Sequence, residues 1–346
     1  MTADARIAAF QGLGAEVRMI LDKRSFTAAG ERLMTFLPSA HLGNAWFTEE
    51  NVRHRLEGIA ANLDKEVMEQ WLSKYSLPNS DSGKTIGVIA AGNIPLAGFD
   101  DFFHTLLCGH NYSGKLSKDD NKLLPLLAEI VMEIEPEFRK KISFTEGKLG
   151  KIDAVIATGS NNSSRYFEYY FSQFPYVIRR NRNSIAVLTG RETSEELTAL
   201  GEDIFRYFGL GCRNVTKLFV PEGYVFDPLF EALFVWGDEM MSNRKYMNNY
   251  EYNRTIYMLN SEKMLDNNFL VIKEDKGIAS PPGVLFYETY TKIEEVLTKL
   301  KVDVEHVQCV VSVDEEFSIN KPGSAQKPFP WEYADGVDTM EFLLKQ

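Results

Sequence analysis

The sequence predicts an α/β protein with a helical N-terminal segment, a doubly wound Rossmann-type parallel sheet and a smaller second α/β unit. Two observations carry this prediction. Short apolar or β-branched runs alternate with helical stretches from about residue 85 to about residue 210, a pattern typical of parallel sheets. Further runs of this kind lie beyond Lys217, at 218–220, 269–272, 284–287 and 307–313.

The first 80 residues are expected to be helical. Apolar side chains recur there at spacings of three and four, which places them on one stripe of a helix. Trp71 and Leu72 extend this stripe, and Pro78 ends it. The stripe consists of Val52, Leu56, Ile59, Leu63 and Val67.

From Thr85 the pattern changes to strands and helices in turn. The run 85–90 is a predicted buried strand, and it is followed by a loop and by a helix that ends near Leu107. In such sheets, ligands bind at the C-terminal ends of the strands. A G-x-G-x-x-G fingerprint is absent. The remaining predicted strands are 112–116, 153–157 and 184–188, and the helices are 121–134, 166–174 and 194–208.

Composition excludes several classes of protein. A chain of 346 residues with 44% hydrophobic and 25% charged residues is typical of a folded globular protein. The net charge of -11 argues against an extended nucleic-acid surface. We find no apolar run of 18 residues and no secretory signal, so we expect a cytoplasmic protein without a membrane span. Three widely separated cysteines indicate neither a disulfide framework nor a metal site.

Cys212 follows a pair of glycines that flank Leu210, in front of a predicted strand. The glycines permit left-handed backbone angles and a close approach of substrate to the main chain. Positive charge on Arg213 and Lys217 would favour the thiolate of Cys212. The alternative is a small buried cysteine after a helix that ends in glycine.

Four short segments, taken together, point to a family. They are Ala91-Gly92-Asn93-Ile94-Pro95, Gly114-Lys115-Leu116-Ser117-Lys118, Thr158-Gly159-Ser160 and Gly209-Leu210-Gly211-Cys212. Their order and spacing over about residues 85–315 resemble the aldehyde dehydrogenase superfamily. The resemblance implies that Cys212 is the nucleophile and that Asn93 helps to form the oxyanion hole. It also implies a dinucleotide site at Ala91, Lys115, Ser117, Lys118, Gly159 and Ser160, and no metal.

Two departures from the family pattern narrow the resemblance. The usual glutamate base is replaced by Ile178 or Arg179, and a second glutamate is replaced within 278–282. A water-activating base is needed only when the thioester on the cysteine is hydrolysed. The chain therefore looks most like the acyl-CoA reductase branch, similar to the fatty acyl-CoA reductase of bacterial bioluminescence. That branch implies reduction of an acyl-CoA or another acyl thioester to an aldehyde by NAD(P)H, in a homodimer.

Two alternatives stay open. One is an acyl-phosphate reductase of the γ-glutamyl phosphate type, and the other is a catalytically degenerate subunit that binds a partner. Lys118 stands where NAD-preferring relatives carry a ribose-binding glutamate, so NADP is expected, although Asp119 next to it keeps NAD possible. The acyl chain length and the acyl carrier stay open as well.

Each cofactor or catalytic position also has a structural alternative. Asn93 is an ordinary turn residue by composition, Lys115 could end a strand in solvent, and Ser160 could cap a helix. A cluster of aromatic residues at 166–174 is expected to be core. The resulting division is a helical segment 1–80, a nucleotide-binding domain 81–208, a catalytic domain 209–316 and a C-terminal arm 317–346, for which oligomerisation is a candidate role.

Overall fold

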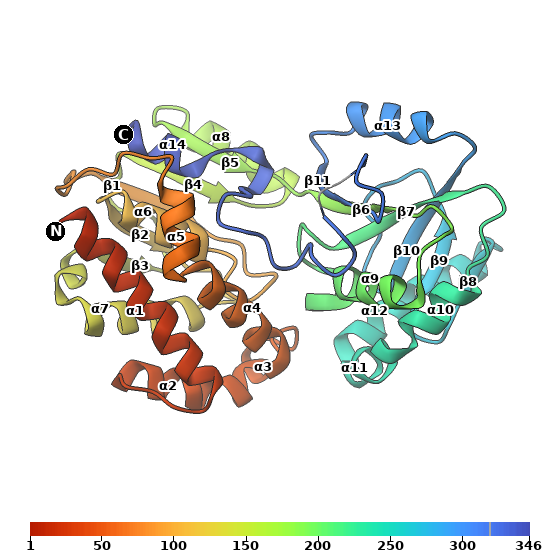
Figure 1. Cartoon of the computed structure of the whole chain (residues 1–346), viewed down its shortest axis with the longest axis horizontal. Coiled ribbons are helices and arrows are strands. Elements are labelled where there is room, and N and C mark those ends of the chain that lie inside the picture. Colours follow the sequence, from red (N-terminus) through yellow and green to blue (C-terminus); the bar gives the residue numbers. More distant parts are fainter. Residues whose placement is uncertain (318–319) are drawn as a thin grey trace. The chain divides into compact units, whose positions relative to one another are not determined.

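The computed structural model of the chain describes residues 1–317 and 320–346, which form two units (Figure 1). Unit 1 combines Met1–Arg180 with Phe329–Gln346, and unit 2 is Asn181–Pro328. Residues 318 and 319, which belong to the predicted C-terminal arm, lie outside the described residues. No helix in the described ranges is long and apolar enough to cross a membrane.

The N-terminal part of unit 1 is helical, as predicted. The predicted apolar stripe is divided between two helices, because the chain turns at Leu63 and Asp64. The side chain of Thr48 begins the first of these helices by accepting the Asn51 N–H at 3.3 Å. The helices are α1 (Ala3–Leu21), α2 (Ala28–Phe36), α3 (Ala40–Gly43), α4 (Glu49–Asn62) and α5 (Lys65–Leu72).

The sheet of unit 1 has five parallel strands in the order β3-β2-β1-β4-β5 (Figure 1). This is the doubly wound sheet that the sequence predicts. The strands are β1 (Thr85–Ile89), β2 (Asn111–Lys115), β3 (Ile142–Thr145), β4 (Ala154–Thr158) and β5 (Tyr176–Arg179). The connecting helices are α6 (Phe99–Leu107), α7 (Leu123–Ile134) and α8 (Asn161–Phe171).

Aromatic rings fill the core where α1 meets this sheet domain. The ring of Phe10 lies 4.6 Å from that of Phe103 and 5.8 Å from that of Phe138. Trp71 of α5 continues the cluster at 5.6 Å from Phe103. All four side chains are almost fully buried, and a buried aromatic side chain of this size supplies roughly 2–3 kcal/mol of burial free energy.

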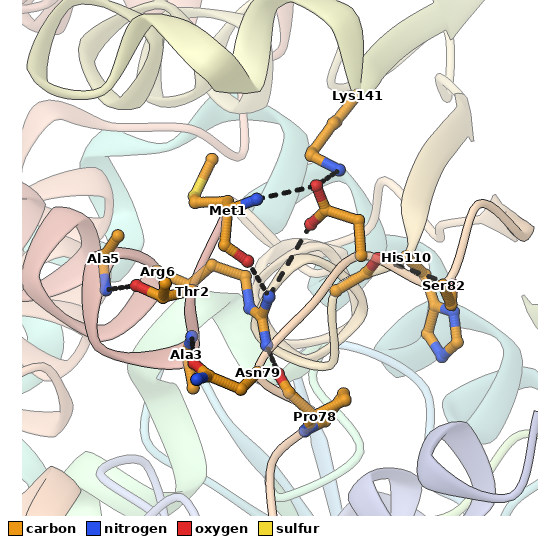
Figure 2. A network of polar contacts seen from close by, with 12 residues as sticks. Met1, Thr2, Ala3, Ala5, Arg6, Pro78, Asn79, Ser82, His110 and Lys141 are labelled. Atoms are coloured by element: carbon orange, nitrogen blue, oxygen red, sulfur yellow. Dashed lines mark hydrogen bonds and ion pairs between the residues drawn. The ribbon is translucent and has the colours of Figure 1, made fainter.

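A buried cation joins α1 to the loop before β1. Figure 2 shows the guanidinium of Arg6 beside the backbone carbonyls of Met1 and Pro78. The guanidinium is fully buried, and it lies 3.6 Å from the carboxylate of Asp81. Arg6 Nε donates to the carbonyl of Leu107 at 2.9 Å, and a second nitrogen donates to that of Pro78. Lys141 pairs with Asp81 at 2.8 Å. The buried charge is therefore satisfied, as a buried guanidinium must be.

The last residues of the chain fold back onto unit 1. The hydroxyl of Tyr333 accepts from Trp71 Nε1 at 2.9 Å and lies 2.6 Å from that of Tyr75. The final helix, α14 (Thr339–Leu344), packs on α6 and buries Met340 completely. Residues 329–346 thus complete unit 1, and the predicted oligomerisation role of the arm stays a prediction.

Unit 2 contains a six-stranded sheet in the order β11-β6-β7-β10-β9-β8, parallel except for β8. Its strands are β6 (Asn183–Val187), β7 (Val215–Pro221), β8 (Met264–Asp266), β9 (Val271–Glu274), β10 (Val284–Tyr290) and β11 (Val307–Val311). Its helices are α9 (Ser194–Phe205), α10 (Asp227–Leu233), α11 (Gly237–Ser242), α12 (Arg244–Leu259) and α13 (Ile293–Val302).

One segment joins a different sheet from the one that we expected. The alternation of strands and helices predicts a nucleotide-binding domain that extends to residue 208, but β6 pairs with β7 and β11 of unit 2. A buried parallel strand has the same kind of apolar sequence in any sheet, so its local sequence does not determine which strands it pairs with. The functional labels of the domains stay predictions.

Candidate functional site

Three of the four predicted segments meet at one edge of the sheet in unit 1. β1 lies between β2 and β4, and Ile89 is level with Lys115 and Ala157 in the register. The C-terminal ends of these strands therefore release the Asn93 loop, the 115–118 segment and the turn at Gly159 side by side. The strand order reverses between β1 and β4, and ligands of doubly wound sheets bind at such a point.

The loop after β1 is packed tightly against the segment after β2. A methyl group on Gly92 would lie 2.3 Å from Ser117 Oγ and 3.1 Å from Asp119 Cβ, so only glycine leaves room here. Asn93 is exposed at the tip of this loop, and Ala91 is half-buried. Lys115 and Ser117 are half-buried, whereas Lys118 is exposed.

The turn after β4 begins a helix, as its residues suggest. Ser160 is the N-cap of α8, and its side chain accepts the Ser163 N–H at 3.2 Å. A side chain on Gly159 would clash with Ser163 and Phe167, each 2.9 Å from the position of its Cβ. The capping role is thus present, and the helix start is also suited to an anion. The pyrophosphate role of Gly159 and Ser160 stays a prediction.

The aromatic cluster on α8 is only partly core. Phe167 and Phe171 pack beside Val155 and Ala157 of β4. Three tyrosines of the same helix are exposed by 66–78%, contrary to the expectation of a buried cluster; they are Tyr166, Tyr169 and Tyr170. The helix therefore presents one apolar face to the sheet and one aromatic face to solvent.

Cys212 is exposed in a turn before β7 of unit 2. The Asn214 N–H closes this turn on the carbonyl of Gly211 at 3.0 Å. Three left-handed residues lead into it, with φ values of 56° at Tyr207, 57° at Phe208 and 75° at Gly209. Left-handed angles are costly for the two aromatic residues, so the surrounding structure must hold them. Both are almost fully buried.

Asn214 organises this turn from inside unit 2. Its fully buried side chain accepts the Gly211 N–H at 2.7 Å. Its amide nitrogen lies within 3.3 Å of the carbonyl oxygens of Asp203, Ile204 and Arg206, where α9 ends. Carbonyls at the end of a helix lack partners within the helix, and one side chain satisfies them here. The sequence analysis did not identify Asn214, because an asparagine beside a turn is common.

A second buried residue holds the backbone of Cys212. The hydroxyl of Ser184 donates to the Cys212 carbonyl at 3.1 Å and lies 3.0 Å from Cys309 Sγ. Burial raises the pKa of the Cys309 thiol to about 11 and that of Cys108 to about 12. Both thiols are therefore protonated and enclosed, and Cys212 alone of the three is exposed.

Lys217 has a local partner. It is 1% exposed, and its Nζ donates to Glu288 at 2.8 Å and to the carbonyl of Asp275 at 2.8 Å. The charge of Lys217 is thus compensated by a carboxylate on β10. We therefore assign Lys217 no role in the activation of Cys212.

Arg179 stands at the end of β5, where the resemblance would place a general base. The guanidinium donates to both oxygens of Asp101, at 2.6 and 2.8 Å, and to Thr339 at 2.9 Å. The group is buried, and Asp101 compensates its charge. This position therefore holds a structural cation and carries no carboxylate to activate water.

Comparisons with known proteins agree with the fold. No protein-family model and no curated protein matches the sequence. Aldehyde dehydrogenase 21 from Physcomitrella patens matches with a TM-score of 0.65 at 13% identity, over 91% of this chain and 74% of that one. An NAD-dependent aldehyde dehydrogenase from Sinorhizobium meliloti matches with a TM-score of 0.65 at 12% identity, over 94% and 72%. Lactaldehyde dehydrogenase from Escherichia coli matches with a TM-score of 0.62 at 15% identity, over 92% and 75%. The chain therefore has the aldehyde dehydrogenase fold, as predicted.

Proposed function

We propose that this chain is an NAD(P)H-dependent oxidoreductase that reduces an acyl-CoA, or another acyl thioester, to an aldehyde through a thioester on Cys212. The observation that carries the proposal is an exposed cysteine in a turn fixed by buried side chains, within an aldehyde dehydrogenase fold. The arginine at the end of β5 supports reduction over hydrolysis, because no carboxylate stands there to activate water.

The sheet edge of unit 1 is suited to a dinucleotide. Gly92 and Gly159 have no side chains, so the backbone stays accessible where β1 and β4 end. Helix α8 begins just after Gly159, and the N–H groups of its first turn are suited to bind an anion. We assign Ala91, Lys115, Ser117, Lys118, Gly159 and Ser160 to the cofactor. A bound reduced nicotinamide would supply a hydride to the acyl carbon. The exposed ammonium of Lys118 favours NADPH over NADH.

In the proposed reaction the thiolate of Cys212 attacks the thioester carbonyl and forms a new carbon–sulfur bond. The oxyanion collapses, the bond to the CoA sulfur breaks, and CoA leaves as a thiolate that takes a proton from water. Once the acyl carbon had received a hydride, the second oxyanion would collapse to the aldehyde and restore the Cys212 thiolate. The Asn93 amide and the Cys212 N–H would stabilise both oxyanions. Loss of one such donor typically costs about 3 kcal/mol of barrier.

A panel of CoA thioesters of increasing chain length, assayed with NADPH and with NADH, tests the proposal. We expect reduction of at least one thioester, faster with NADPH, and a loss of at least a thousandfold in C212A. The matched control is C108A, which removes a buried thiol of unit 1 and should keep most of the turnover. Iodoacetamide should label Cys212 rapidly, and the substrate should block this labelling.

Three results would contradict the proposal. Full turnover in C212A would remove the nucleophile. An inert Cys212 in a chain that reduces none of the thioesters would indicate a partner-binding subunit, and reduction of acyl phosphates alone would indicate the other enzymatic alternative.

A further inference from the structure

Asp120, to which the sequence analysis gave no role, holds the loop that carries Asn93. Its Oδ2 accepts the Leu96 N–H at 2.8 Å. Leu96 lies three residues after Asn93, is fully buried, and adopts a left-handed φ of 56°. A branched residue rarely adopts this conformation, so a specific contact is needed to hold it there.

The same short turn touches the loop on the other side of Asn93. Ser117 packs against Gly92, where a methyl group would lie only 2.7 Å from Ser117 Cβ. Residues 117–120 form a tight turn, in which the Asp120 N–H donates to the Ser117 carbonyl at 3.3 Å. Asn93 is therefore bracketed by two contacts. The one before it comes from Ser117, which we assign to the cofactor, and the one after it comes from Asp120, at the end of the same turn.

Burial of the ionised carboxylate of Asp120 lowers the free energy of unfolding. Burial raises its pKa to about 6, while the backbone N–H groups of Leu96 and Leu123 oppose this rise. Its Oδ1 is buried and has no hydrogen-bond partner among the described residues. A raised carboxyl pKa means that stability is fully present below the unfolded pKa of about 3.9 and is lost as the pH rises through 6. An asparagine would also accept from Leu96, without this loss.

We propose that Asp120 is a positioning residue, which fixes the Asn93 loop through the Leu96 amide and so couples the cofactor segment at 115–118 to the oxyanion donor. This inference rests on the proposed function, because it takes Asn93 as the donor. Binding of the cofactor at Lys115 or Lys118 would restrict the motion of the 117–120 turn. The turn would then restrict the Asn93 loop through its contacts with Gly92 and Leu96. A shift of about 1 Å in such a donor can cost roughly a hundredfold in rate.

Kinetics of variants at Asp120 and Asn93 test the coupling. We expect D120A to lower kcat roughly tenfold to a hundredfold, because the loop is released while Asn93 is intact. D120N should stay within about threefold of the wild type, because its amide oxygen still accepts from Leu96. In the N93A background D120A should cost no further rate, since residues that act through each other are not additive. E66Q is the control at an exposed carboxylate on α5 and should leave kcat unchanged.

Hydrogen exchange supplies a readout that does not need turnover. The peptide containing Leu96 should exchange faster in D120A than in the wild type and in D120N, and NADPH should slow its exchange in the wild type. D120E displaces the carboxylate by one methylene and is the milder variant. If D120A fails to fold, D120E should show the faster exchange at Leu96 and the lower kcat that we expect of D120A. Labelling of Cys212 by iodoacetamide should be the same in all of them.

Three outcomes would overturn the inference. They are wild-type kcat in D120A, an equal loss from D120A with and without Asn93, and unchanged exchange at Leu96. If the wild type reduced no acyl donor, the proposed function would fail. The exchange data would still decide whether Asp120 holds the loop and whether the loop responds to NADPH.

Discussion

Asn214 shows how one buried side chain fixes the turn that carries Cys212. Replacement of Asn214 by alanine removes its contact with Gly211 and the hydrogen bonds that its amide nitrogen makes to the carbonyls at the end of α9. Unsatisfied buried groups of this kind are expensive, so we expect N214A to lower the free energy of unfolding by roughly 3 kcal/mol. Urea denaturation followed by circular dichroism measures this change.

The control is N260A, at an exposed asparagine that follows α12. It should change the free energy of unfolding by less than about 0.5 kcal/mol. Equal stabilities of N214A and the wild type would show that water replaces the lost partners.

For single residues, the sequence predicts Cys212 but not the buried side chains that hold its turn. Cys212 and the left-handed Gly209 could be identified because glycines beside a cysteine form a local pattern. Ser184, Asn214 and Asp120 could not, since each is a single polar residue with contacts to backbone that only the fold brings near. Their local sequences fit an ordinary turn or strand equally well.

Among the elements, the central strands could be predicted, whereas of the edge strands only β11 was predicted. β1, β4 and β7 are buried and read as continuous apolar runs. The edge strands β3 and β8 are short and half exposed, so they lack such runs. The helix α12 was also missed, because only Tyr246 and Tyr250 of its sixteen residues are buried and no apolar stripe marks it.

The docking of α14 should depend on pH through His110. Its Nε2 lies 2.9 Å from the Leu343 carbonyl, and its Nδ1 lies 2.6 Å from the Ser82 hydroxyl. Burial lowers the pKa of His110, although the Leu343 carbonyl opposes this. The fold therefore favours the neutral ring. The stability linked to this ring is present above the unfolded pKa of about 6.5 and is lost as the pH falls below it.

We expect faster hydrogen exchange in α14 at pH 5.5 than at pH 7.5, after correction for the intrinsic rates. In H110Q, whose side chain does not titrate, this difference should shrink. A pH dependence as large in H110Q as in the wild type would assign the effect to another group.

For the whole molecule, the fold class followed from the alternation of strands and helices, while the division into units did not. The chain leaves unit 1 after Arg180 and returns to it at Phe329. This division depends on pairing between strands that are far apart in the sequence, such as β6 with β11. The four spaced segments pointed to the aldehyde dehydrogenase fold even though matched structures share only 12–15% of their residues with this chain.

A homodimer is the oligomeric state that the family resemblance implies. Large apolar side chains are exposed on unit 2, with Phe234 at 73% and Leu259 at 80%, and exposed apolar groups are common where subunits meet. Sedimentation equilibrium should therefore give twice the mass of one chain, with dissociation on dilution. A single-chain mass at every concentration would contradict the expectation.

The return of residues 329–346 to unit 1 has a consequence for synthesis of the protein. The ribosome makes these residues after unit 2, so the first sheet emerges without the helix that covers α6. Until then the surface that receives Met340 stays open to solvent, and chaperones recognise surfaces of this kind. Translation that stalls within unit 2 would thus release a first unit that is still incomplete.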